Sequence, residues 1–569
     1  MSRPESAVDR VANQYVRELS ALSPGVRIAL GHPDPPGAPL LDDHSPDGAA
    51  RRNDLAVDTL RELDTVEAVD EVDRVTMDAM HERLEVAVES HEWGLHLGDV
   101  NVIASALPEI RDTFELVPTD TIGDLESLAN RLAEVPTAIE GHFEAIAAGL
   151  AIGRRPAERQ VRKVAEQAHA AASDDGALAR RLTEITGNHP GLPDTLATRL
   201  AEQTAVARRA FGAAGDRLLT EVLDGARAED ACGRDEYQLA SRRFLGTSVD
   251  LDETYEWGLD LLRGIIDEQQ QVAREITGSP DIDAAIAALD ADPALKLHGT
   301  EALQQWMQQL GDAAIAALDG THFDIPEPLH RLEARISTSG TGGIYYTGPS
   351  DDFTRPGRMW WAVPAGSTEF TTWRETTTVY HEGVPGHHLQ VGYATAQSGE
   401  LNDWRRNLCW TSGHGEGWAL YAERLMADLG FLDHPGDRMG MLDAQRLRAA
   451  RVVLDIGVHL GKPMPEPFAG GTWTGGGVWD AEQAWEFLNS QVSMDEPVLR
   501  FELDRYLGWP GQAPSYSVGQ RVWEQIRDEA RALAESRAGR FSAKAFHTRA
   551  LKLGGLGLDT LRRALAPGP

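Results

Sequence analysis

Apolar residues recur at intervals of three and four positions along most of the chain. The stretch VDRVTMDAMHERLEVAVESH shows the pattern clearly, and this spacing is typical of amphipathic helices. We predict helices over residues 5–22, 52–68, 72–92, 124–150, 156–172, 190–226, 251–276, 300–318, 403–428, 440–460, 480–494 and 519–537. The chain is therefore expected to be mostly α-helical.

One stretch departs from the helical period. Residues 333–364, EARISTSGTGGIYYTGPSDDFTRPGRMWWAVP, combine alternating polarity, aromatic residues and Gly/Pro turns, which predicts two or three short strands. A Pro/Gly/Asp-rich loop is expected at 23–48 and a glycine-rich loop at 464–479. The character of the chain changes near residues 230–235, so we predict a helical N-terminal part, 1–232, and a second part, 233–569, that holds the unusual motifs.

Composition narrows the possible partners. The 569 residues include 89 Asp and Glu against 54 Lys and Arg, a formal net charge of −35. A field of that sign opposes binding to nucleic acid and to anionic membrane surfaces. Cys232 and Cys409 match no metal-binding spacing, and the start has no apolar signal region. We expect a cytoplasmic protein without nucleic-acid or membrane partners; the oligomeric state is left open.

The segment YHEGVPGHHLQ, residues 380–390, resembles a zinc-binding helix with an interruption. His381 and Glu382 begin the usual HExxH pattern, but Pro385 occupies the position of the second histidine. Proline cannot bind a metal, so the second ligand would be His387 or His388. On a straight helix His388 lies about 10 Å further along the axis and His387 points to nearly the opposite face. A kink or bulge at Pro385-Gly386 could bring either histidine into place.

A third ligand is expected from HGEGWALYAERL, residues 414–425, where Glu416 begins a helical stretch. Two histidines and one carboxylate, with a fourth position left for water, are a common ligand set of catalytic zinc. Glu382 directly follows His381, where it could take a proton from that water. Glu423 shares a helix face with Glu416, so Glu423 and His414 are candidate supporting partners. The alternative is a histidine-rich structural turn and a helix-start glutamate that interacts with the helix dipole.

Several motifs together resemble a bacterial family known only as domain of unknown function 885 (DUF885), whose members look like relatives of the gluzincin metallopeptidases. The resemblance is carried by HEGVPGHHLQ at 381–390, EGWALYAERL at 416–425, DIGVHLGK at 455–462 and RYLGWPGQAPSYSVG at 505–519. It covers roughly residues 230–540. Four motifs in order are a more specific signal than a lone His-Glu pair.

The resemblance implies a large helical zincin-type body with a deep cleft, as in thermostable carboxypeptidase-like and oligopeptidase-like proteins. A small β-sheet would form one cleft wall and hold a peptide along its edge strand, and residues 1–232 would form another wall or a lid. Those relatives carry a glycine before the second ligand histidine, so Gly386-His387 favours His387. One Zn²⁺ ion per chain is implied.

Further polar residues are candidates for roles around such a site. Tyr506 and Tyr516 could donate a hydrogen bond to an oxyanion, and His459, four residues after Asp455, could be oriented by that carboxylate. Candidates for substrate binding are Tyr345, Tyr346, Arg355 and Arg505, because tyrosines could reach the cleft and arginine pairs with carboxylates. The alternatives are packing aromatics, a core histidine and ordinary surface ion pairs.

These observations predict a zinc-dependent peptidase that hydrolyses short peptides with a metal-activated water. Two other functions fit the same residues. One is a metal-dependent amide or C–N hydrolase acting on a small metabolite. The other is a non-catalytic protein that binds a peptide or metabolite. Exo- or endopeptidase action and side-chain preference are left open.

Overall fold

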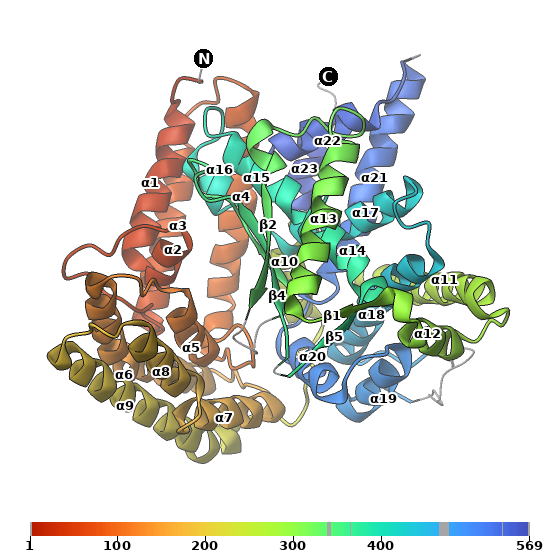
Figure 1. Cartoon of the computed structure of the whole chain (residues 1–569). Coiled ribbons are helices and arrows are strands. Elements are labelled where there is room, and N and C mark those ends of the chain that lie inside the picture. Colours follow the sequence, from red (N-terminus) through yellow and green to blue (C-terminus); the bar gives the residue numbers. More distant parts are fainter. Residues whose placement is uncertain (1–2, 338–342, 365, 466–476, 538, 567–569) are drawn as a thin grey trace.

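The computed structural model describes residues 3–337, 343–364, 366–465, 477–537 and 539–566 (Figure 1). Most of these residues are helical, as the periodicity predicts. Most of the glycine-rich loop expected at 464–479 lies outside the described residues. No helix in the described part of the chain combines the length and the apolar character needed to cross a membrane.

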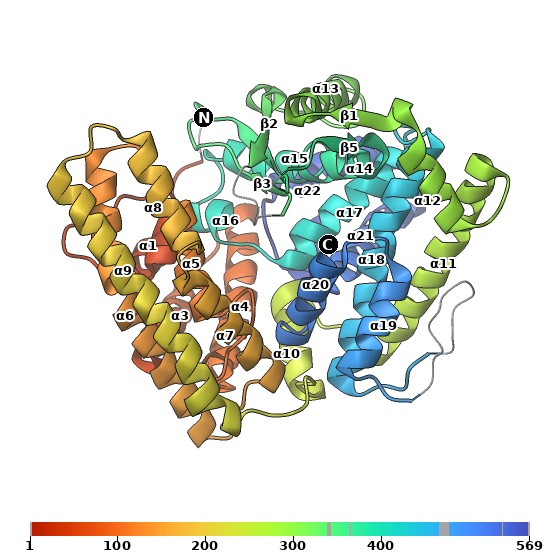
Figure 2. The ribbon, with the colours of Figure 1, turned by 60° about the horizontal axis from the view of Figure 1, so that its bottom comes forward.

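Helices of the first 230 residues contribute to two hydrophobic cores. The larger core takes buried residues from α1 (Ala7–Leu22), α3 (Pro46–Leu63) and α4 (Glu71–Glu92). The smaller core lies among α5 (Ala106–Leu116), α6 (Ile122–Ala151), α7 (Glu158–Ala172), α8 (Ala177–Asn188) and α9 (Asp194–Arg217), which form one side of the molecule in Figure 2. The loop expected at 23–48 contains a short helix, α2 (Pro24–Ala29). The division at residue 232 stays a prediction. Helices α1, α3 and α4, which precede it, share a core with helices that follow it.

The later helices build most of the larger core. They are α10 (Arg234–Leu245), α11 (Leu251–Thr277), α12 (Ile282–Ala291), α13 (Thr300–Leu318), α14 (Thr372–Glu382), α15 (His387–Ala396), α16 (Asp403–Asn407), α17 (Ser412–Asp428), α18 (Pro435–Leu460), α19 (Ala481–Gln491), α20 (Glu496–Gly508), α21 (Ser515–Ser536), α22 (Ala543–Lys552) and α23 (Leu558–Leu565). The helix predicted over 403–428 is two helices, because the chain leaves the helical path between α16 and α17.

A three-stranded sheet forms in the stretch predicted to contain strands. Its order is β2 (Leu332–Ser337), β4 (Gly357–Ala362) and β3 (Tyr345–Thr347), with β2 parallel and β3 antiparallel to β4. Along β4 the residues alternate between buried and half-buried, as expected for a strand with one face on the core. A separate antiparallel pair, β1 (Lys296–His298) with β5 (Glu369–Thr371), was not predicted.

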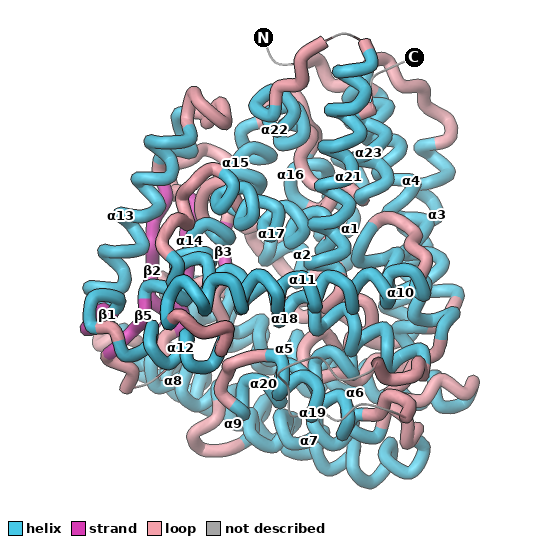
Figure 3. Tube along the Cα trace, turned by 90° about the vertical axis from the view of Figure 1, so that its right-hand side faces the viewer, coloured by secondary structure: helices cyan, strands magenta, loops and turns pink. Residues whose placement is uncertain are grey.

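The two edges of the three-stranded sheet differ. Helix α13 runs beside β2 (Figure 3), and the side chains of Gln304 and Gln308 hydrogen-bond to the backbone of Leu332 and Ala334. These bonds cover the first part of the outer edge of β2. Across the described residues, no backbone hydrogen bond joins the outer edge of β3 to another segment. An open strand edge can pair with an extended peptide.

Candidate metal centre

The Pro-Gly interruption ends one helix and starts the next. Helix α14 stops at Glu382 and α15 begins at His387, so the expected kink or bulge is a complete break. The backbone N–H of Gly386 donates to the carbonyl of Tyr380 at 3.1 Å, which closes a tight turn. A side chain at Gly386 would place its Cβ 1.9 Å from the carbonyl oxygen of His381. Only glycine fits there, and the turn brings His387 back beside His381.

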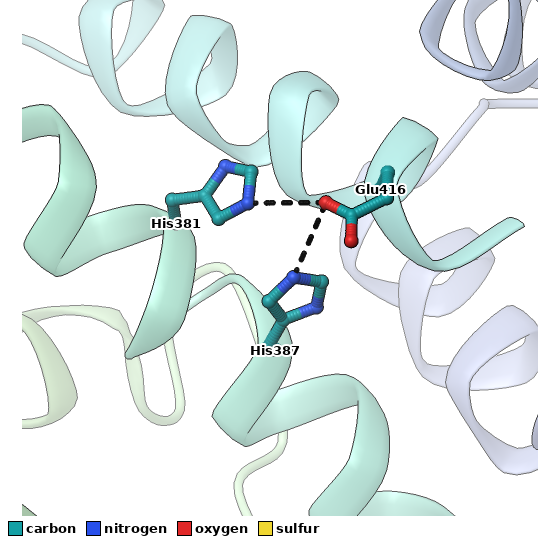
Figure 4. A group of neighbouring side chains, drawn as sticks. All are labelled: His381, His387 and Glu416. Carbon is teal, nitrogen blue, oxygen red and sulfur yellow. Dashed lines mark ion pairs between the residues drawn. The ribbon is translucent and has the colours of Figure 1, made fainter. Parts of the chain in front are cut away.

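Three side chains from three helices converge at this break (Figure 4). Nε2 of His381 lies 3.3 Å, and Nε2 of His387 lies 3.6 Å, from Oε2 of Glu416. The donor atoms of the three residues all lie within 4.8 Å of one another, so the three could hold a metal ion. His381, His387 and Glu416 are called the metal group below. Donors that each lie about 2 Å from a tetrahedral zinc are separated by roughly 3.3 Å. The spacing and the two-histidine, one-carboxylate donor set therefore both fit zinc.

The histidine on α14 is oriented from behind by a buried carboxylate. Nδ1–H of His381 donates to Oε1 of Glu423 at 2.7 Å, and Oγ1 of Thr377 donates to the other oxygen of Glu423 at 2.8 Å. Glu423 is only 1% exposed. When the ring is neutral, a carboxylate on the far ring nitrogen fixes the tautomer in which Nε2 carries the free lone pair. Glu423, predicted as a supporting partner, is thus hydrogen-bonded to His381, and Thr377 adds a second bond to the same carboxylate.

The carboxylates of Glu416 and Glu423 determine the protonation state of His381. Burial opposes a charged imidazole, but the hydrogen bonds to Glu416 and Glu423 outweigh it and raise the pKa of His381 to about 10. Burial likewise opposes a charged Glu416, but the two histidines hold the pKa of this carboxyl well below its usual range. At neutral pH the cluster therefore contains an imidazolium facing a carboxylate.

We expect zinc binding to release a proton from His381, because the metal needs a neutral imidazole. The raised pKa means that this proton is present throughout the neutral range and is lost only as the pH approaches about 10. Titration calorimetry at pH 8 in two buffers of different ionisation enthalpy measures the release. Glu423→Gln is the control: it removes one of the two raising carboxylates and should release fewer protons. Equal heats in both buffers for the unaltered protein would contradict the expectation.

Glu382 directly follows His381 and is the last residue of α14. Its side chain is buried, and its Oε2 has no hydrogen-bond partner within the described residues. Burial raises the pKa of this carboxyl. A buried carboxylate next to the metal ligands, with one oxygen unused, suits a group that exchanges protons with a water.

Residues 24–565 match the model of a family described as "Bacterial protein of unknown function (DUF885)". The chain belongs to the DUF885 family. This confirms the family that the four motifs indicate. No curated protein matches this DUF885 chain.

Two solved structures share the fold of this DUF885 protein. A "putative lipoprotein" from Colwellia psychrerythraea aligns at a TM-score of 0.80 with 20% identity over 98% of each chain. Another from Shewanella oneidensis, described as of unknown function, aligns at 0.72 with 16% identity over 99% of this chain and 100% of that one. A carboxypeptidase of Pyrococcus furiosus aligns at only 0.38 with 11% identity over 99% of each chain, too low to support an inference.

His388, the other candidate for the second ligand, is not part of the metal group. Its Nε2–H donates to the carbonyl of Leu329 at 2.8 Å, and its Nδ1 accepts the hydroxyl of Tyr346 at 2.9 Å. Burial lowers the pKa of His388 to about 4, so the ring stays neutral. In this DUF885 protein His388 therefore ties α15 to β3, next to His387 in the chain.

The two candidate tyrosines both lie against Arg451, whose guanidinium is 5.2 Å from the ring centre of Tyr506 and 5.1 Å from that of Tyr516. Burial and, after it, the charge of Glu416 raise the pKa of Tyr516, so its hydroxyl stays protonated at neutral pH. The hydroxyl of Tyr506 accepts from Nε of Arg451 at 2.5 Å and donates to Glu502. Arg505 pairs with Glu502 at 2.9 Å. Tyr506 and Arg505 thus belong to one buried ion-pair network, whereas Tyr516 is the tyrosine on which the charge of Glu416 acts.

Two predicted histidines bind backbone groups. Nε2–H of His459 donates to the carbonyl of Tyr506 at 3.1 Å, and Nδ1 accepts the N–H of Cys232 at 3.3 Å. Asp455 accepts instead from Tyr237 and from the backbone of the WPGQAPS loop. Nδ1 of His414 accepts the N–H of Leu556 at 2.8 Å, and its ring stacks on Trp523. These groups fasten α17, α18 and α20 around the metal group.

The predicted substrate-binding residues of the strand region lie on or next to β3. Tyr345 stacks on Trp360 of β4 and is 43% exposed. Arg355 is close enough to Tyr346 for its charge to act on that phenol, and it has no carboxylate partner within the described residues. Tyr345 and Arg355 therefore remain accessible groups beside the strand edge.

Two residues near the site were not predicted. The charge of Arg448, on α18, acts on both Glu382 and Tyr516, and Arg448 forms no ion pair with any described residue. The ring of Trp410 lies 6.3 Å from that of His387 and is 46% exposed. The sequence offers no spacing that links either residue to the HEGVPGHH motif, because both depend on tertiary packing.

Proposed function

We propose that this DUF885 protein is a zinc-dependent peptidase that hydrolyses short peptides. The observation that carries the proposal is the buried convergence of His381, His387 and Glu416, with Glu382 directly beside them. A zinc ion held there would supply Lewis acidity, polarising a carbonyl and lowering the pKa of a water. None of these three donors is a cysteine, the ligand that is typical of closed structural zinc sites.

The residues around the three ligands fit the steps of amide hydrolysis. Glu382 would accept a proton from the attacking water and deliver it to the departing amine, which its raised pKa favours. Tyr516, protonated at neutral pH, would donate a hydrogen bond to the oxyanion that forms from the carbonyl. Glu423 and Thr377 would keep His381 in its orientation.

The surroundings indicate how a peptide would be held. The open edge of β3 would pair with the substrate backbone, and β3 is anchored next to the site by the bond between Tyr346 and His388. Arg448 and Arg355 lack carboxylate partners within the described residues, so either could pair with a substrate carboxylate. Backbone pairing would make recognition tolerant of side chains.

The direct test is a comparison of substrates with zinc-loaded protein. Short unlabelled peptides with free and with amidated C-termini, and small N-acyl amides, are incubated and analysed by liquid chromatography and mass spectrometry. We expect peptide cleavage that stops on chelation and returns with added zinc. Cleavage of the small amides alone would support the metabolite hydrolase instead. Binding of peptides without any cleavage would support a non-catalytic role and overturn the proposal.

A further inference from the structure

A cavity of about 700 Å³ lies apart from the metal group, between α4, α15, α16 and α22. It is lined by Glu71, Val72, Val75, Asp324, Gln397, Glu400, Leu401, Arg405, Ala545, Thr548, Arg549, Lys552 and Leu553. None of these residues belongs to the metal group or contacts it in the site described above. Its volume falls in the range typical of sites for small organic molecules.

The cavity wall holds three cations and three acids, but two of the acids are paired with cations outside the wall. Three cations line it, Arg405, Arg549 and Lys552, and none forms an ion pair with a described residue. Two of the three acids already have partners: Asp324 pairs with Lys544 at 2.6 Å, and Glu71 with Arg74. Only Glu400 is left to oppose the three cations. This excess of positive charge stands out in a chain of net charge −35.

Arg405 is the unusual member of the set. It is 1% exposed, and among the described residues its guanidinium donates to two neutral groups, the hydroxyl of Thr76 at 3.2 Å and the carbonyl of Leu553. Its Nε has no hydrogen-bond partner within the described residues. A buried guanidinium without an anionic partner is costly. An anion entering the cavity would supply the missing partner, as guanidinium pairs well with carboxylate and phosphate.

Another part of the wall is apolar. Val72 and Val75 of α4 lie on it together with Leu401, Ala545 and Leu553. A ligand with an apolar body could cover these side chains while its charged end approaches Arg405. We propose that this cavity binds a small organic anion, a carboxylate or a phosphate monoester carried on an apolar group. Arg405, Arg549 and Lys552 would recognise the charge.

The segment lining the cavity also joins the two ligand helices. Gln397 and Arg405 lie between α15, which begins with His387, and α17, which carries Glu416. A ligand bound there would contact the connection between two metal ligands. The binding itself, however, does not depend on the proposed peptidase activity.

The test is calorimetric titration of the full chain with four probes of one size: hexanoate, hexyl phosphate, hexanol and hexylammonium. We expect the two anions to bind and the alcohol and the cation not to bind, and the stronger anion identifies the headgroup. Lys552→Glu, at an exposed position, should weaken anion binding about tenfold or more by reversing one charge. Ala545→Trp should abolish binding by filling the cavity, whereas Ala545→Ser should leave it unchanged.

Arg405→Gln should abolish anion binding as well, and the variants at exposed positions keep the test valid if this buried substitution prevents folding. The proposal is overturned if neither anion binds the folded protein at millimolar concentration. It is also overturned if Ala545→Trp and Lys552→Glu bind both anions as tightly as the unaltered chain. Because binding is read directly, this result is independent of any result with peptides.

Discussion

Replacing Glu382 with glutamine is expected to lower kcat on a short peptide by about 10²–10⁴-fold while zinc stays bound. The glutamine amide has nearly the same shape but cannot take the proton of a water. His381, His387 and Glu416 are untouched, so the metal group should keep its ion. KM should change little, since the substitution removes a proton acceptor rather than a substrate contact.

A matched control lies on the same helix. Burial raises the pKa of Glu375 on α14, as it does for Glu382. The carboxylate of Glu375, however, accepts a hydrogen bond from Nε1 of Trp361 and is not part of the metal group. Glu375→Gln should therefore leave kcat nearly unchanged. Steady-state kinetics and metal content by mass spectrometry are measured on both variants. Full activity of Glu382→Gln, with zinc present, would rule out Glu382 as the proton-transfer group.

Long helices were predictable because each buries a face along many turns. The periodic pattern places α11 and α13 to within about a residue of their ends. Short helices such as α2 and α12 were missed, since six or ten residues give too few repeats of a 3.6-residue period. The pair β1 and β5 was missed for a related reason: each strand is three residues long and is defined by its distant partner.

The three side chains that converge were predictable up to one ambiguity. The residue types of HEGVPGHH limited the second histidine to two positions, but the choice depends on the backbone between Glu382 and His387. That turn requires a residue without Cβ at Gly386 and fastens to α17 through the bond from Trp418 to the carbonyl of Pro385. Such contacts between helices cannot be obtained from spacing along one helix.

Among the residues that support the metal group, contacts within one helix were predictable from the sequence and contacts between elements were not. Thr377 and His381 are four residues apart on one helix, so their shared contact with Glu423 could have been anticipated from helical spacing. The pairing of Tyr346 with His388 joins a strand to a helix, and the proximity of Arg448 to Glu382 joins two helices. Those relations follow from the packing of the whole core, which no local pattern describes.

Removing any one metal ligand is expected to abolish stoichiometric zinc binding. His381→Ala, His387→Ala and Glu416→Ala each leave two donors, and two donors hold zinc far more weakly than three. Glu423→Gln should be milder, with affinity reduced about 10–100-fold, because it disturbs the orientation of His381 without removing a donor.

His388→Ala tests whether His387 or His388 is the second ligand, because the sequence allows either. His388 bonds to Leu329 and Tyr346, so the variant should keep about one zinc per chain. It should lose roughly 1–3 kcal/mol of folding stability, since two buried polar groups lose their partner. Metal content and denaturant unfolding are measured on all five variants. If zinc is lost from His388→Ala but retained in His387→Ala, both in folded protein, then His388 is the ligand, and the turn at Gly386 must differ from the one described here.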